Sequence, residues 1–438
     1  MKNKTQKRIK RKYLLGSKLT KRNHRIRKRK NYKIIHSKTP IDIRILGEGM
    51  STTNNSSYTS TISSIPLSYT PTITSDPSSK LEKKVSIGNN SSYAPTINEK
   101  LITIRSIPRS KLEDCNNQAA FEMKEPLKIG VSDQFFHKTC FEYFTPEAKK
   151  ILLKNLAANK HIKILDVVPP LQIDSNCWFN TMFSTLFISD KGRKFFHYFR
   201  QLMIEGTQAN GEKIPDKLRN GFALLNFAID ASLTGNKYAY VLNTNNIIRK
   251  IYEAIPESYH VRLPYIKNVG EAGNPIQYYN SIINYLHHGY AKSPIELLYV
   301  SDCTSDWKNR VHVEIEKKTH LPHIIVIEIF DENDGTAGNS GVVKNKQLEF
   351  GSDGGKYVLD SCIVRDKQRQ HFCATLTCEK KQFGYDGMSF HRIVPMEWKK
   401  YINSDFEWSF EGSNNRDGTP LRWNFMHGYQ TFLYYRTH

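Results

Sequence analysis

The chain has 438 residues, of which 39% are hydrophobic, and its formal net charge is +22. The charge is uneven, because residues 1–40 hold 17 of the 64 Lys and Arg residues and no Asp or Glu. The basic character therefore belongs to one end and says little about the rest of the chain. No apolar run reaches the roughly 18–20 residues that a membrane span needs. The charged first residues also lack the apolar stretch of a secretory signal.

The cysteines narrow the function classes further. There are seven, an odd number, and no two have C-x-x-C spacing. This pattern argues against a disulfide scaffold and against a zinc site built from cysteine pairs. We therefore expect no metal and no cofactor, and an intracellular, reducing compartment.

Three segments follow one another along the chain. Residues 1–49 form a basic arm that cannot build a core, because like charges repel. For residues 1–40 we expect contact with nucleic acid or another polyanion, which would suit a nucleus or a virion. Residues 50–119 are rich in Ser and Thr and read as a low-complexity linker. Residues 120–438 have the patterns of a folded domain.

In the folded domain, helical patterns come first and strand patterns second. Thr145 followed by Pro146 predicts a helix start, and Ile164–Val168 reads as a short strand. Helical apolar spacing is found over 149–156, 177–187, 191–204, 215–232, 245–254 and 275–288. Strand patterns cover 297–300, 323–329, 357–364, 371–379 and 429–436. The order predicts an α+β fold, with a helical lobe over about 140–290 and an antiparallel sheet lobe over about 295–438.

One cysteine has the setting of a nucleophile. Cys177 follows a polar Asp-Ser-Asn turn and opens an apolar helix. A helix N-terminus stabilises a thiolate, which is the reactive form of cysteine, and its free amides can bind a developing oxyanion. Gln172 lies five residues upstream and could turn its side-chain amide toward the same oxyanion. The competing interpretation is an ordinary buried cysteine.

A nucleophilic cysteine needs a base, and the base needs an orienting group. His371 opens a strand pattern, and a tight turn at Lys380–Gln382 leads to a second strand that ends at Asp386. In such a hairpin, His371 and Asp386 fall at the same end of the sheet. The carboxylate can then accept the imidazole N–H and fix its tautomer. The competing interpretation is an ordinary hairpin with an edge histidine.

Together the two segments resemble the ubiquitin-specific proteases. The matching residues are Gln172, Asn176–Thr181, Tyr357, Leu359, His371–Phe372, Phe383–Asp386 and the terminal run 429–436. The resemblance implies a papain-like cysteine protease with Cys177 as nucleophile, His371 as base, Asp386 as orienting acid and Gln172 as oxyanion donor. It also implies ubiquitin or a ubiquitin-like protein as substrate. Divergent proteases of this type are similar to ones carried by large DNA viruses.

Two alternatives stay open. Asp174 stands three residues before Cys177, a spacing similar to that of ovarian-tumour-type deubiquitinases, whose base would then be His427. The other alternative is a non-catalytic protein that holds nucleic acid through its basic arm and keeps a degenerate protease scaffold. Reaction with an electrophilic ubiquitin probe would separate these readings.

Overall fold

We describe the protein from a computed structural model, which covers residues 114–132, 138–208, 210–286, 295–301, 303–330, 342–350, 355–368 and 371–437. The basic arm and almost all of the predicted linker lie outside the described residues. The fold nevertheless begins before residue 120. Asn116 is 3% exposed, and its side chain exchanges two hydrogen bonds with the backbone of Lys128. Buried contacts are therefore found a few residues before the predicted boundary at residue 119, and the division into three segments stays a prediction.

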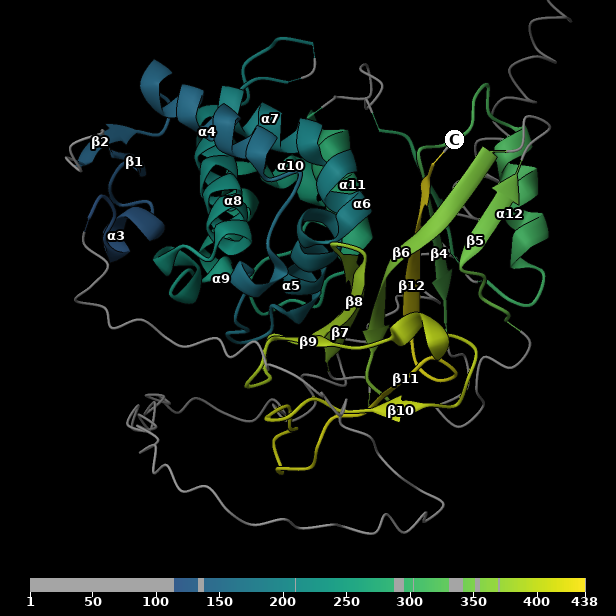
Figure 1. The fold of residues 1–438 in the computed structure, drawn as a ribbon. Coiled ribbons are helices and arrows are strands. Elements are labelled where there is room, and N and C mark those ends of the chain that lie inside the picture. Colours follow the sequence, from purple (N-terminus) through teal and green to yellow (C-terminus); the bar gives the residue numbers. More distant parts are fainter. Residues whose placement is uncertain are drawn as a thin grey trace, which may run out of the picture.

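Helices form one lobe, on the left of Figure 1, with the small hairpin β1 (Lys128–Ser132) and β2 (Lys138–Glu142) at its edge. Thr145 caps the amide of Ala148 and Pro146 occupies the first turn, as the sequence predicts. The helices are α3 (Gln118–Phe121), α4 (Pro146–Ala158), α5 (Cys177–Phe183), α6 (Asp190–Phe195), α7 (His197–Glu205), α8 (Asp216–Thr234), α9 (Thr244–Ala254), α10 (Glu257–His260) and α11 (Pro275–Leu286).

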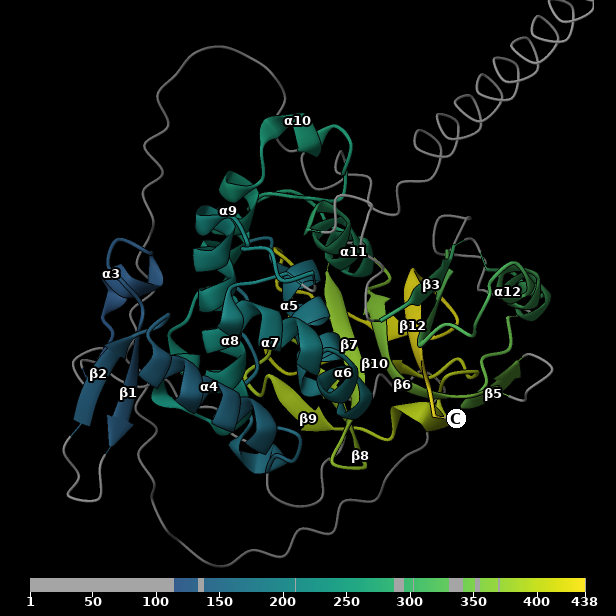
Figure 2. The same cartoon turned by 90° about the horizontal axis from the view of Figure 1, so that it is seen from above.

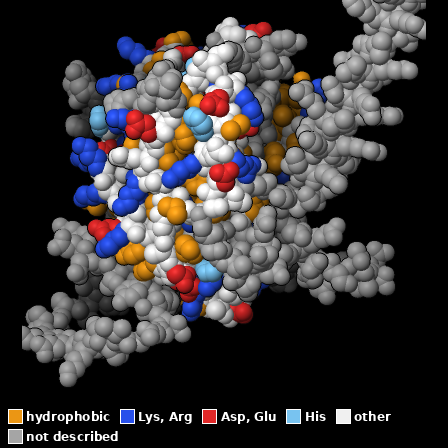
Figure 3. Space-filling view, turned by 90° about the vertical axis from the view of Figure 1, so that its right-hand side faces the viewer, with side chains coloured by type: hydrophobic (Ala, Val, Ile, Leu, Met, Phe, Trp, Pro, Cys, Tyr) orange, Lys and Arg blue, Asp and Glu red, His pale blue; other side chains and the backbone are white. Residues whose placement is uncertain are grey.

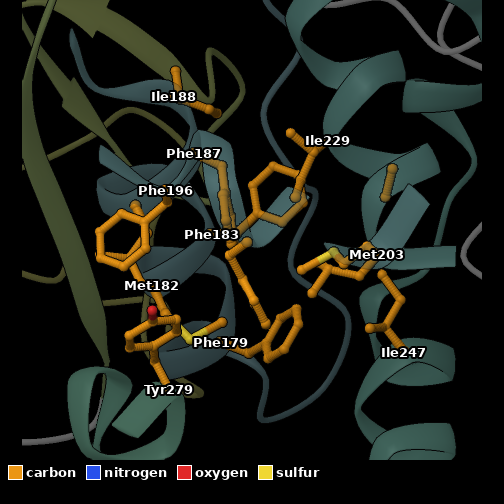
Figure 4. Packing of buried hydrophobic residues seen from close by; sticks show 14 of the residues in the cluster. Phe179, Met182, Phe183, Phe187, Ile188, Phe196, Met203, Ile229, Ile247 and Tyr279 are labelled. Carbon is orange, nitrogen blue, oxygen red and sulfur yellow. The ribbon is translucent and has the colours of Figure 1, made fainter. Parts of the chain in front are cut away.

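The core of this lobe lies around α5 and the π-helical turn Ser184–Ile188 that continues it. Figure 4 shows Phe179, Phe183 and Phe187 among side chains contributed by the neighbouring helices α7, α8, α9 and α11. Every residue from Trp178 to Ile188 is buried. Because α5 is enclosed on all sides, the residue at its start is held by a rigid element.

The sheet forms the second lobe, with strand order β3-β4-β12-β6-β7-β8-β9 and β5 paired with β6. Its strands are β3 (Leu297–Val300), β4 (Ile324–Ile329), β5 (Gln347–Phe350), β6 (Gly355–Arg365), β7 (Phe372–Cys378), β8 (Lys381–Tyr385), β9 (Ile393–Pro395) and β12 (Gln430–Arg436). A separate short pair, β10 (Glu407–Trp408) and β11 (Trp423–Asn424), lies below it in Figure 1. The α+β prediction is confirmed. The sheet is not wholly antiparallel, however, because β3 pairs with β4 in parallel.

Both faces of the sheet are covered. Along β4, Ile324 and Val326 belong to the core shared with the helical lobe, whereas Ile325 and Ile327 belong to a second core. This second core also takes side chains from α12 (Trp307–Glu316). Figure 2 shows the helical lobe on one side of the sheet and α12 on the other. Alternate residues of the strand therefore serve different cores, as the two-residue period of a strand requires.

A buried polar cluster joins the two lobes. Glu328 of β4 is 3% exposed and accepts hydrogen bonds from Tyr299, from Tyr429 and, at 2.9 Å, from the side chain of Asn274. The side-chain oxygen of Asn274 accepts the amide of Gln277 at the start of α11. Burial raises the pKa of both phenols well above the ordinary value, so they remain donors. One carboxylate therefore links the sheet to the helical lobe.

The turn between β7 and β8 comes one residue earlier than predicted. Glu379 and Lys380 form it, with φ of 47° and 63°, values that favour glycine. Asp190 accepts both of their amides, at 2.8 and 2.9 Å. Arg193 completes the arrangement with ion pairs to Asp190 and Glu379. Glu379 and Lys380 do not favour this turn conformation, and hydrogen bonds and an ion pair from α6 of the helical lobe stabilise it.

The strand predicted at Ile164–Val168 is wrong. Residues Ile164–Asp166 form a 3-10 turn, in which Leu165 is 66% exposed. The segment pairs with the end of a helix and not with a strand, because the amide of Val168 donates to the carbonyl of Ser232 in α8. Val167 and Val168 are buried in the core of the helical lobe, so the strand pattern correctly indicated their burial although it gave the wrong backbone conformation.

The expectation against disulfides is wrong for one pair. Cys115 and Cys140 are bonded, with their Cα atoms 5.6 Å apart. Asp114 pairs with Lys138 at 2.7 Å beside them, so the segment before α3 and β2 are brought together. The five other cysteines are free, and the reducing compartment remains a prediction. Among the described helices, none is both long and apolar enough to cross a bilayer.

Candidate active site

Cys177 stands at the first position of α5 and is half-buried. The turn before it places Asp174 in the left-handed region, with φ of 56°. The side chain of Asn176 makes no capping bond to the helix, and the first amides of a helix have no carbonyl partner within it. These amides are therefore directed toward the side of the helix start where the thiol lies.

The segment that leads to this turn is fixed between the lobes. The carbonyl of Pro169 accepts a hydrogen bond from Arg392 at 2.7 Å, and that of Pro170 accepts one from the Tyr385 hydroxyl at 2.8 Å. Both donors belong to the sheet lobe, near the end of β8 and the start of β9. These two hydrogen bonds fix the segment that precedes Cys177 relative to the sheet.

His371 and Asp386 lie together at one end of the β7–β8 hairpin, as the hairpin pattern predicts. Nε2 of His371 is 2.6 Å from a carboxylate oxygen of Asp386, and the two side chains are 3% and 0% exposed. Burial alone lowers the pKa of the imidazole. The charge and hydrogen bond of Asp386 outweigh this effect and, with smaller contributions from the Cys177 thiol, raise the pKa of His371 well above its ordinary value.

Cys177 is one of the groups that raise the pKa of His371, so its sulfur lies within interaction range of the imidazole. A thiolate there favours the imidazolium through its negative charge and as a hydrogen-bond acceptor. Since Nε2 of His371 faces Asp386, Nδ1 is the nitrogen left for the sulfur. The structure thus brings Cys177 at the start of α5 together with His371 and Asp386 of the β7–β8 hairpin.

Asp386 has partners for both of its carboxylate oxygens. One oxygen binds His371 and also accepts the amide of Met388 at 3.0 Å. The other accepts the hydroxyl of Ser413, which is fully buried in the loop between β10 and β11. A carboxylate with three hydrogen-bond donors around it is held in one orientation.

The backbone of His371 is fixed by a second buried carboxylate. Asp366 accepts the His371 amide at 2.5 Å, and its own amide donates to the His371 carbonyl at 2.9 Å. The ring of Trp423 meets the imidazole edge to face, with centroids 5.9 Å apart. Asp366 therefore fixes the backbone of His371, while Asp386 and Trp423 fix the position of its ring.

Gln172 is placed beside the site but is not free to donate there. Its side-chain Nε2 donates to the carbonyl of Asp174 at 3.1 Å, within its own turn. Its backbone amide donates to the carbonyl of Gly387, next to Asp386. The predicted oxyanion donor would have to break its present bond to act. The amides at the start of α5 are the donors that need no such change.

The two residues of the ovarian-tumour-type alternative have partners outside the Cys177–His371–Asp386 arrangement. His427 pairs with Asp405 at 3.5 Å, and that aspartate is 77% exposed. The carboxylate of Asp174 contacts the side chain of Asn245 at 3.3 Å. Across the described ranges, no group of three or more His, Cys, Asp or Glu side chains is arranged to hold a metal ion.

Sequence reasoning missed the residues that support the site from a distance. Asp366 had a weak signal, since an acidic residue follows the strand pattern directly and can accept the amides of the turn. Ser413 had none, because it reaches Asp386 from 27 residues further along the chain. Trp423 looked like any core aromatic residue.

Comparison with known proteins finds only distant likenesses. No family model and no curated protein matches the chain. Among solved structures, the SAGA DUB module Ubp8/Sgf11/Sus1/Sgf73 bound to monoubiquitin is 10% identical, with a TM-score of 0.36 over 62% of this chain and 70% of that chain. A yeast SAGA DUB module with a substituted Sgf73 is 11% identical, with a TM-score of 0.29 over 63% and 68%. Neither gives support to a viral source.

Proposed function

We propose that this protein is a papain-like cysteine hydrolase that cleaves an amide or isopeptide bond. One observation carries the proposal: the buried His371 ring binds Asp386 through one nitrogen and interacts with the half-exposed Cys177 thiol. A nucleophile, a base and an orienting acid in this order are what thiol-dependent acyl transfer requires.

The chemistry follows from the two protonation states of the pair. The high pKa of His371 favours its protonated, imidazolium form, and the deprotonated sulfur is the form in which a cysteine acts as nucleophile. The Cys177 sulfur attacks the substrate carbonyl carbon, and the amides at the start of α5 bind the oxyanion. His371 then protonates the leaving amine as the C–N bond breaks, which leaves a thioester. Neutral His371 next takes a proton from water, and the hydroxide attacks the thioester carbonyl. The C–S bond then breaks, which releases the acid product and restores the Cys177 thiolate beside the His371 imidazolium.

Ubiquitin or a ubiquitin-like protein is the substrate class that we propose. The support is the resemblance of the two sequence segments to ubiquitin-specific proteases. In such a reaction the scissile carbonyl would belong to the modifier's C-terminal residue, and the leaving amine to the modified protein. The chemistry of Cys177 and His371 does not depend on this choice of modifier.

A ubiquitin with an electrophile in place of its C-terminal carboxylate tests the proposal directly. Wild-type protein is expected to form a covalent adduct, and Cys177→Ser is expected to form none. His371→Ala should slow adduct formation at least about 100-fold. The matched control is His427→Ala, which should react like wild type. Loss of reaction in His427→Ala with wild-type reaction in His371→Ala would favour the ovarian-tumour-type alternative, and hydrolysis by Cys177→Ala would refute the cysteine mechanism.

The basic arm remains a separate prediction. Residues 1–40 lie outside the described part of the chain, and we propose that they bind nucleic acid or another polyanion. On the face of the folded part drawn in Figure 3, Lys and Arg side chains lie among Asp and Glu and form no continuous basic field. Deletion of residues 1–40 should therefore abolish retention on immobilised nucleic acid at low salt. It should leave adduct formation at Cys177 unchanged.

A further inference from the structure

Three buried side chains form a closed hydrogen-bonded ring behind the candidate nucleophile. Thr244 donates to the side-chain oxygen of Asn180 at 2.7 Å, and Asn180 donates to that of Asn176 at 3.2 Å. Asn176 donates back to the Thr244 hydroxyl at 2.9 Å. All three are at most 2% exposed. Each member both donates and accepts, so the ring is complete only with all three.

The ring also binds the backbone on both sides of Gln172. The side-chain oxygen of Asn176 accepts the amide of Ile173 at 3.2 Å, and Asn180 donates to the carbonyl of Leu171 at 3.2 Å. Reversing either side-chain amide would oppose two donors or two acceptors, so each has one orientation. The turn before Cys177 is therefore shaped by these side chains.

Thr244 is the member that anchors the ring to the core. It opens α9, whose Ile247, Ile248 and Ile251 are fully buried in the helical lobe. Asn176 precedes Cys177 directly, and Asn180 lies one helical turn after it. Next to Thr244, Asn245 donates to the carbonyl of Ile173 at 3.0 Å. The start of α9 thus holds the start of α5, although the two are 67 residues apart along the chain.

We propose that Thr244 is a positioning residue for the reaction, which sets the Cys177 thiol against His371 through Asn176 and Asn180. This inference rests on the proposed function. Thr244 itself touches neither the reacting atoms nor their hydrogen-bond partners in the His371–Asp386 pair. Its hydroxyl fixes the two residues that flank the thiol, and a displacement of about 1 Å is enough to lower a rate about 100-fold.

The test removes the hydroxyl with little change in shape. Thr244→Val leaves the oxygen of Asn180 and the amide of Asn176 without their ring partner, whereas Thr244→Ser keeps both bonds. Thr375→Val is the matched control. Thr375 is fully buried, but its hydroxyl has no hydrogen-bond partner among the described residues.

Two rates are measured on folded full-length protein. The first is alkylation of Cys177 by iodoacetamide between about pH 5 and 9, followed by mass spectrometry of its peptide. This readout is selective, because the other four free cysteines are buried. The second is hydrolysis of ubiquitin that carries a C-terminal fluorogenic amide, from which kcat and KM are obtained separately.

We expect Thr244→Val to lower both the alkylation rate near neutral pH and kcat about 10- to 100-fold, with KM little changed. Thr244→Ser should restore both rates to within about threefold, and Thr375→Val should behave like wild type. A folded Thr244→Val protein with wild-type rates would overturn the inference, as would an equal loss in Thr375→Val.

Two further outcomes are decisive. If Thr244→Val does not fold, Thr244→Ala is measured in its place. Failure of both to fold while Thr375→Val folds would overturn a positioning role, because the ring would then be needed for the fold itself. Equal hydrolysis by wild type and Cys177→Ala would refute the proposed function. The alkylation rates would still decide whether Thr244 positions the thiol.

Discussion

Asp360 gives the sharpest prediction about stability. This residue of β6 is 3% exposed, and its carboxylate accepts the amide of Lys191 at 3.0 Å. Burial raises the pKa of Asp360 to about 6, despite the opposing effects of the Ser189 hydroxyl, the charge of Lys399 and the Lys191 amide. The carboxyl group is therefore easier to protonate in the folded protein than in the unfolded chain.

The sign of the pH effect follows from this order of pKa values. When the pH is below 3.8, the ordinary pKa, Asp360 is protonated in the folded and in the unfolded state, and its contribution to stability is fully present. As the pH rises toward 6, the unfolded chain ionises first, and stability is lost. The difference between about 6 and 3.8 corresponds to a loss of about 3 kcal/mol.

The substitution Asp360→Asn removes this titration and keeps an oxygen for the Lys191 amide. The free energy of unfolding, measured by urea denaturation, should therefore shift in favour of the variant by about 2.4 kcal/mol between pH 4 and pH 7. Other titrating groups act equally on both proteins, so the difference isolates Asp360. If that difference changed by less than about 0.5 kcal/mol across this range, the reasoning would be refuted.

Three further predictions follow from the site and its supports. Asp386→Asn should lower the pKa of His371 and reduce kcat at least about 100-fold, with the alkaline limb of the pH–rate profile moved to lower pH; an unchanged profile would contradict this. Gly273→Ala would place a methyl group 2.5 Å from the Trp178 ring. It should cost about 1–3 kcal/mol in thermal unfolding, and a wild-type melting curve would argue against the packing. Asp190→Ala should expose the amides of the β7–β8 turn and accelerate their hydrogen exchange, whereas full protection there would show that the turn needs no support.

Local patterns in the sequence predicted most helices and the strands that carry His371 and Asp386, because those depend on apolar spacing over a few residues. They could not predict that β3 runs parallel to β4, since strand pairing depends on contacts far apart in the chain. The Cys115–Cys140 disulfide was not predicted, for a similar reason. An odd cysteine count says nothing about which two sulfurs the fold brings together.

In the candidate site, too, some residues could be predicted from the sequence and others could not. Cys177, His371 and Asp386 stood out because each opens or ends an element, where chemistry-bearing residues are presented. Thr244 and Ser413 support them through single hydroxyl groups placed by distant segments, and a lone Thr or Ser in a polar sequence carries no signal. Gln172 is the opposite case. Its position in the sequence fits an oxyanion donor, but its side-chain amide donates to the carbonyl of Asp174 in the structure.

The carboxylate of Glu328 has a mechanical consequence for the two lobes that it links. Its bonds to Asn274, Tyr299 and Tyr429 are directional, so a slide of one lobe over the other would strain several of them at once. An apolar interface of the same area would resist such shear far less. We therefore expect Cys177 of the helical lobe and His371 of the sheet lobe to keep a constant separation.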